Sequence, residues 1–142
     1  MTIEDGQNSN NKREFFRINV ETPLEFVNFT SRGQEHQKTA LMEGVSKNIS
    51  QSGLLFHTEA KPPKISSILW MNLDIRTLKI CQEIEDRALL FNDGLVGRVV
   101  RVEEDVLNNI YNVGVCFLTQ DQKNNRDIQK LLTEIDRAGT AH

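Results

Sequence analysis

Short stretches in which apolar and polar residues alternate recur along most of this chain, and they constrain its fold more than any other feature. In the first of them, Phe16, Ile18 and Val20 alternate with Arg17 and Asn19, which is the period of a half-buried β-strand. Residues typical of turns separate the stretches. The chain is therefore predicted to be mainly β. The predicted strands cover residues 16–28, 39–49, 54–57, 68–75, 95–102 and 110–118.

The C-terminal part of the chain follows a different period. Thr119 or Asp121 is expected to cap a helix there, and Gly139 stands where the helix should end. A helix with one apolar face needs a surface to cover. Several strands followed by one helix predict a small antiparallel barrel or sandwich with the helix packed on it. The apolar residues at i, i+3, i+4 and i+7 are Ile128, Leu131, Leu132 and Ile135.

One stretch, residues 76–92, fits two structures. Leu78 and Ile80 fit a strand, whereas a longer set of apolar residues fits a helical stripe. We expect an extra helix around residues 77–91, with a strand as the alternative. Asn108 and Asn109 follow the last-but-one predicted strand and favour a hairpin turn. The helical set is Leu78, Cys81, Ile84, Ala88 and Phe91.

Composition limits the class of protein. The 142 residues predict one domain, over residues 12–138, between a flexible polar tail at 1–11 and a short tail at 139–142. A net charge of −3 argues against binding a nucleic acid polymer. No apolar run is long enough for a membrane span. Cys81 and Cys116 have no disulfide or zinc spacing, so we expect them to pack in the core of a cytoplasmic protein.

Two polar motifs stand apart from these patterns. Arg13 and Arg17 form an Arg-x-x-x-Arg, and Asn48, Ser50 and Gly53 form an Asn-x-Ser-x-x-Gly. Taken singly, the first is usually a pair of solvated surface arginines and the second an ordinary turn. In this order on a β-rich chain, they resemble the ligand signature of the PilZ family, bacterial receptors for cyclic di-GMP.

The resemblance implies a six-stranded antiparallel β-barrel with a C-terminal α-helix. It implies that Arg13 and Arg17 grip guanine and phosphate, and that Asn48 and Ser50 contact a guanine edge. Gly53 would shape the turn, either through a positive φ or through close backbone approach. In the family, the position before the first arginine influences whether one ligand or a stacked pair binds. Here that position is Lys12, a weaker candidate for contact, and the stoichiometry stays open.

Arginine suits such a ligand because its planar fork pairs with phosphate or with guanine O6 and N7, and its plane stacks on a base. On a straight strand, residues i and i+4 are about 13 Å apart. Arg13 and Arg17 therefore act together best if Arg13 lies in a flexible segment that curls over the ligand. Asn48 offers an amide donor and acceptor, and Ser50 a hydroxyl.

The sequence thus predicts a non-catalytic receptor. Cyclic di-GMP is the expected ligand, with no cofactor, and binding is expected to change the conformation of the N-terminal segment. The signal would pass by protein contacts to a downstream bacterial protein whose identity the sequence does not give, and the oligomeric state also stays open. The alternative is a PilZ-like scaffold that acts by protein contacts without the nucleotide. Catalysis is not expected, since His36, His57 and His142 show no metal spacing.

Overall fold

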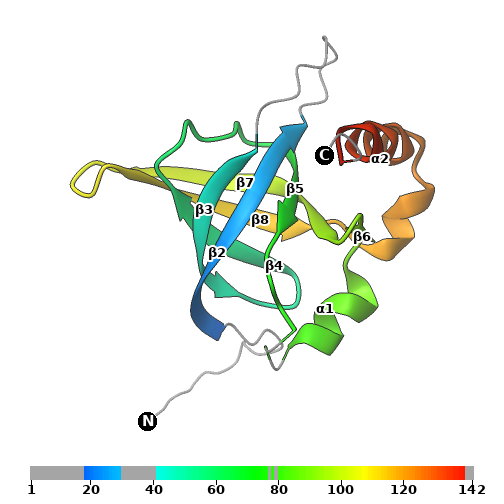
Figure 1. Ribbon diagram of the computed structural model, residues 1–142, viewed down its shortest axis with the longest axis horizontal. Helices are drawn as coiled ribbons and strands as arrows, with labels where there is room; N and C mark the ends of the chain where they lie inside the picture. Colours follow the sequence, from blue (N-terminus) through cyan, green and yellow to red (C-terminus); the bar gives the residue numbers. More distant parts are fainter. Residues whose placement is uncertain (1–17, 30–40, 77, 79, 140–142) are drawn as a thin grey trace.

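A closed β-barrel forms the body of the protein (Figure 1). The structure is a computed structural model that describes residues 18–29, 41–76, 78 and 80–139. Six strands pair in the order β5-β2-β3-β4-β8-β7, and β5 pairs with β7 to close the ring. All of these pairings are antiparallel. The six barrel strands are β2 (Ile18–Phe29), β3 (Met42–Ile49), β4 (Gly53–Thr58), β5 (Ile68–Asn72), β7 (Gly94–Asp105) and β8 (Ile110–Phe117). A short further strand, β6 (Leu90–Phe91), pairs with β7.

The mainly β prediction, with its barrel and C-terminal helix, is confirmed. The alternation in the sequence is the cause, because successive side chains of a strand point to opposite faces of the sheet. In β8, Val113, Val115 and Phe117 are buried inside the barrel, whereas Gly114 and Cys116 between them are not. The rings of Phe26 and Phe56 meet in the barrel interior at 4.9 Å between centroids.

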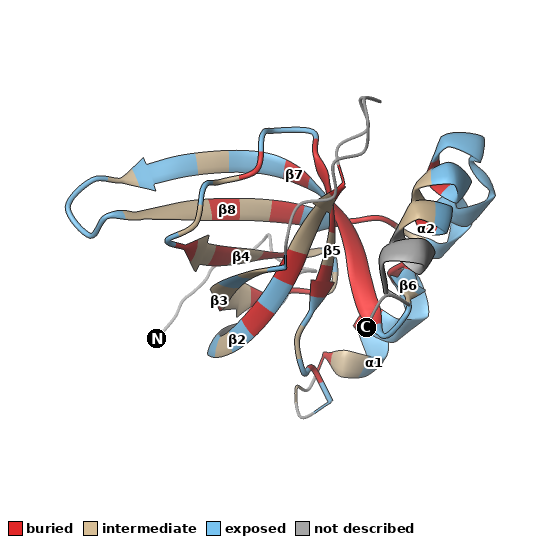
Figure 2. Ribbon diagram, turned by 45° about the horizontal axis from the view of Figure 1, so that its top comes forward, coloured by how far each residue is buried: buried red, intermediate tan, exposed pale blue. Residues whose placement is uncertain are grey.

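The C-terminal helix α2 (Arg126–Gly139) covers one part of the outer barrel surface (Figure 2). Ile128 and Leu132 of its apolar stripe are buried in a second cluster that includes barrel residues such as Ile68 and Val96. The helix is described as far as Gly139, where the sequence predicted its end, but the predicted cap was wrong. The side-chain oxygen of Asn125 accepts hydrogen bonds from the backbone N–H groups of residues 127 and 128, at 2.8 and 3.2 Å.

Thr119 instead begins a short 3₁₀ helix, η1 (Gln120–Asn124), which precedes α2. The backbone N–H of Thr119 donates to the side-chain oxygen of Gln122 at 2.8 Å. Gln120 also donates a hydrogen bond of 2.8 Å to the carbonyl of Glu85. These two hydrogen bonds hold the start of η1, the first of them within the turn and the second to the end of α1.

The extra helix around 77–91 is present but shorter than the apolar stripe suggested. It is α1 (Cys81–Arg87), in which Ile84 is the buried residue. Leu78 packs against the core from the segment before the helix, and Phe91 belongs to strand β6. The stripe overestimated the helix because its outer members pack against the barrel from irregular or extended backbone.

The β7–β8 hairpin extends from the barrel as a long arm (Figure 1). Its turn was predicted correctly, and Asn109 takes the left-handed conformation with φ of 57°. Two apolar residues at the tip are strongly exposed, Val106 at 75% and Leu107 at 94%. A register shift between Val99 and Arg101 marks a β-bulge at the base of the arm, which bends a strand and increases its twist.

Candidate functional site

The Asn-x-Ser-x-x-Gly motif lies where β3 passes into β4. Asn48 is the last-but-one residue of β3, Ser50 follows the strand, and Gly53 opens β4. Ile49 between the first two is 1% exposed in the barrel core, and Asn48 is half-buried on the opposite face of β3. The other predicted ligand residues, Lys12, Arg13 and Arg17, lie outside the described residues.

Ser50 holds the turn together. Its hydroxyl donates to the carbonyl of Gly53 at 3.3 Å and accepts from the backbone N–H of Ser52 at 3.3 Å. Its backbone N–H also donates to the carbonyl of Gly53 at 2.8 Å. At 8% exposure Ser50 is nearly covered. The hydroxyl therefore shapes the loop that presents its neighbours.

Gly53 is needed for close approach of two strands. It pairs with Cys116 of β8, and a Cβ atom added to it would overlap the carbonyl oxygen of Val115. Its φ lies outside the left-handed region. Of the two roles expected for this glycine, close backbone approach is the one that the structure supports. The turn is further attached to β8 by the backbone N–H of Phe117, which donates to the carbonyl of Ser52 at 2.9 Å.

The start of β2 runs beside this turn. Ile18 pairs with Ile49, and Asn19 pairs with Asn48. The chain immediately before Ile18 is thus joined to a point next to the Asn-x-Ser-x-x-Gly motif. The side-chain amide of Asn48 makes no hydrogen bond to another described residue, so it is available to a ligand or to the preceding segment.

The neighbouring strands bring further polar residues to the same outer surface. Arg98 of β7 and Gly53 of β4 both pair with Cys116, which lies between them on β8. The prediction that Cys116 packs in the core was wrong, because it is exposed while Val115 and Phe117 on either side are buried. The alternation of apolar residues along β8 already indicated this, because Cys116 falls on the face opposite Val115 and Phe117. The two sequence motifs did not point to Arg98, since only the strand register brings it to the site.

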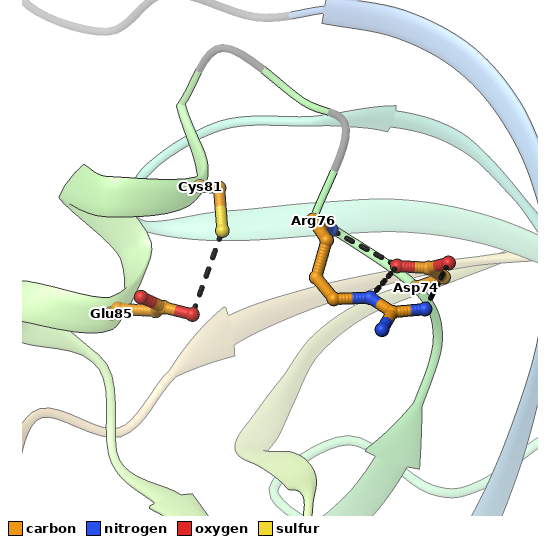
Figure 3. A network of polar contacts seen from close by, with 4 residues as sticks. All are labelled: Asp74, Arg76, Cys81 and Glu85. Carbon is orange, nitrogen blue, oxygen red and sulfur yellow. Dashed lines mark hydrogen bonds and ion pairs between the residues drawn. The ribbon is translucent and has the colours of Figure 1, made fainter.

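A second polar cluster, well away from the motif in sequence, precedes and enters α1 (Figure 3). The Nε and Nη2 atoms of Arg76 donate to the two carboxylate oxygens of Asp74 at 3.0 and 3.1 Å. These hydrogen bonds lower the pKa of Asp74 to about 2. Both side chains are largely exposed, so the pair is a surface contact of small energetic value.

In the same region, the thiol of Cys81 donates to the Oε2 atom of Glu85 at 3.5 Å. Burial first, and then this contact with Glu85, raise the pKa of Cys81. A thiol with a raised pKa is less nucleophilic at neutral pH, because the thiolate is the reactive form. This agrees with the expectation that Cys81 packs rather than reacts.

Elsewhere on the barrel, described residues line two surface hollows. The larger, of about 770 Å³, lies over the start of β3 and the end of β4, and the smaller, of about 480 Å³, lies between β5 and the β6–β7 turn. Neither is lined by the Asn-x-Ser-x-x-Gly motif. Acidic lining makes the larger hollow a poor place for a phosphate, since like charges repel. Its carboxylates belong to Glu25, Glu43, Glu59 and Asp74.

Within the described ranges, His, Cys, Asp and Glu side chains nowhere gather in a group of three that could hold a metal ion. Among the same residues, no helix is long and apolar enough to cross a membrane.

Comparison with known proteins identifies a family. Residues 11–134 match the family model of the PilZ domain. Among solved structures, the PilZ domain with c-di-GMP of YcgR from Escherichia coli is similar, with 12% sequence identity and a TM-score of 0.46. That similarity covers 90% of this chain and 94% of the other chain. No curated protein matches this sequence significantly.

Proposed function

The chain belongs to the PilZ domain family, and we propose that it is a non-catalytic receptor for cyclic di-GMP. Arg13 and Arg17 would engage guanine and phosphate, and Asn48 would meet a guanine edge. The hydroxyl of Ser50 would contact the same guanine edge, Gly53 would shape the turn, and Lys12 would add charge. The domain would span residues 12–138.

One observation carries this proposal, the register at the start of β2. Because Ile18 pairs with Ile49, two motifs far apart in the sequence are joined to neighbouring points of the barrel. Arg17 is covalently bonded to Ile18, and Arg13 is only five residues before it, a reach of at most about 17 Å. Both arginines can therefore meet a ligand held at Asn48.

The energetics are sufficient for tight binding. A bidentate arginine–guanine pair gives roughly 1–3 kcal/mol of discrimination, and stacking on a base gives roughly 1–3 kcal/mol more. Two arginines on two guanines can then supply much of the roughly −8 kcal/mol that corresponds to micromolar affinity.

Calorimetric titration of cyclic di-GMP into the full chain tests the proposal. We expect a dissociation constant of about 1 µM or tighter and much weaker binding of cyclic di-AMP, which lacks the guanine O6 acceptor. Chromatography of the recovered ligand should show that it is unchanged. The absence of heat at ligand concentrations about a hundredfold higher, from protein that circular dichroism shows to be folded, would refute the receptor function.

Binding is further proposed to change the conformation of the segment before β2, by drawing Arg13 and Arg17 onto the ligand. This is a switch in which a ligand fixes one arrangement of a segment. Hydrogen exchange is expected to slow at residues 15–18 when cyclic di-GMP saturates the protein. Equal exchange with and without ligand would exclude this mechanism while leaving the binding itself intact.

The signal would then pass to a downstream bacterial protein. The strongly exposed Val106 and Leu107 at the hairpin tip also fit the second candidate function, a scaffold that works by protein contacts alone. The titration separates the two. A cytoplasmic location is proposed as well, since Cys81 and Cys116 are both free thiols.

A further inference from the structure

The outer surface of β4, β8 and β7 continues directly from the Asn-x-Ser-x-x-Gly turn. One row across these strands is Gly53, Cys116 and Arg98, and the next is Leu55, Gly114 and Arg101. Asn48 of β3 pairs with Leu55 and extends the second row toward β2. The buried residues between the rows, such as Leu54 and Val115, point into the barrel. We call the six residues of the two rows on β4, β8 and β7 the platform.

The platform is low and open in its middle. A Cβ atom added to Gly114 would meet only the Cβ of Arg101 at 3.4 Å and the Cγ2 of Val100 at 4.0 Å. The platform has no side chain at Gly53 and Gly114 and a small one at Cys116. Strands lie about 4.8 Å apart, so about 10 Å separate Gly53 from Arg98. A flat base can lie over such a floor.

The charge of the platform is not uniform. Arg101 is paired with Glu103 at 3.2 Å. Arg98 is exposed, and its guanidinium makes no ion pair or hydrogen bond with the part of the chain that the structure describes. Beyond Arg101 the arm becomes acidic at Glu103, Glu104 and Asp105. An anion on the platform is therefore attracted to the Arg98 end and repelled from the arm.

On the side opposite the arm, the platform ends at the buried cluster under α2. Val96, two residues before Arg98, is buried in the cluster under α2, together with Leu118. The acidic arm lies on one side of the platform and the cluster under α2 on the other. A ligand with one end at Asn48 and the Ser50 turn can therefore extend across β8 only toward Arg98. That strip ends at a cation whose fork matches phosphate and guanine.

We propose that Arg98 is a further ligand-binding residue, which contacts the far guanylate of the same cyclic dinucleotide whose near half lies at Asn48. The inference rests on the proposed function, because it takes its ligand from there. Cyclic di-GMP has two guanines and two phosphates, so one half can reach Arg98 while the other stays at the motif. Arg98, with no partner among the described side chains, gives up no internal contact when it binds.

Two native thiols allow a direct test of this placement in the full chain. Cys116 is exposed on the platform beside Arg98, whereas Cys81 is half-buried at the start of α1. Saturating cyclic di-GMP is expected to slow maleimide labelling of Cys116 at least tenfold and to leave Cys81 unchanged. Equal labelling of Cys116 with and without ligand would overturn the proposal.

Titration of cyclic di-GMP into the Arg98→Ala variant is the second test. Loss of one arginine contact should weaken binding about tenfold, with the same number of ligands per chain as the parent protein. Arg87→Ala, which removes an exposed arginine from α1, is the matched control and should bind like the parent. Gly114→Val, which fills the floor without changing charge, should also weaken binding.

The outcomes separate the two proposals. If the parent protein binds cyclic di-GMP and Arg98→Ala binds equally well, the receptor function stands and the role of Arg98 is refuted. If Arg98→Ala lowers the number of ligands per chain, Arg98 serves a second molecule and the single-ligand placement is refuted. If the parent protein does not bind at all, both proposals fall.

Discussion

Replacement of Arg17 by alanine is expected to weaken cyclic di-GMP binding by at least about a hundredfold. The variant loses both a fork contact with phosphate or guanine and a stacking surface, each of which contributes roughly 1–3 kcal/mol. Arg13→Ala should have a similar effect. Calorimetric titration beside the parent protein measures both losses. Their size exceeds the tenfold effect expected for Arg98, since the two motif arginines are proposed to make both kinds of contact.

Two control variants separate the effect of the planar arginine fork from the effect of its positive charge. Arg17→Lys keeps the positive charge and removes the planar fork, so affinity should still fall about tenfold. Arg87→Ala changes net charge by the same amount as Arg17→Ala at a site on α1 and should bind normally. If Arg87→Ala weakens binding as much as Arg17→Ala, the attraction is a general effect of net charge and the motif assignment is wrong.

Replacement of Gly53 by alanine is expected to destabilise the fold by about 3 kcal/mol, in the upper part of the range for overpacked sites. The added Cβ would overlap the carbonyl oxygen of Val115 and lie 3.3 Å from the Cα of Cys116. Both neighbours are backbone atoms of β8, which cannot move aside without separating the strands. Urea unfolding followed by the fluorescence of Trp70, the single tryptophan, measures the free energy of unfolding.

Gly114→Ala is the matched control for this prediction. Gly114 lies in β8 on the same outer surface, and its added Cβ would make only ordinary contacts with side chains. Its free energy of unfolding should stay close to that of the parent or rise slightly, because alanine restricts the unfolded chain. If Gly53→Ala unfolds at the same urea concentration as Gly114→Ala, close strand approach is not the role of Gly53.

The sequence predicted the barrel well because its strands are amphipathic. Alternation at Val113–Phe117 follows from one face packing inside a closed sheet. The end of α1 was harder to predict. Leu78 and Phe91 are apolar because they pack against the two core clusters, and a helical period continues through them by coincidence. The α2 cap was misplaced because Thr119, which has the right chemistry, caps the preceding 3₁₀ turn.

The candidate site could be predicted only in part. The motif placed Asn48, Ser50 and Gly53 together because they are close in the sequence. Arg98 could not be found that way, because its position depends on the register of β7 against β8. Register shifts between Ser46 and Asn48 and between Val99 and Arg101 change which residues lie side by side. Periodicity alone does not locate such bulges.

The bulge at the base of the β7–β8 arm also bears on how the protein avoids aggregation. Strand β5 pairs with β7 only as far as Arg98, so among the described strands none covers the outer edge of β7 along the rest of the arm. An uncovered edge can recruit a strand from another molecule. Here the exposed Val100 lies at the bulge, and charged Arg101, Glu103 and Glu104 follow it. Distorted backbone and charge together make this edge a poor template for intermolecular sheet growth.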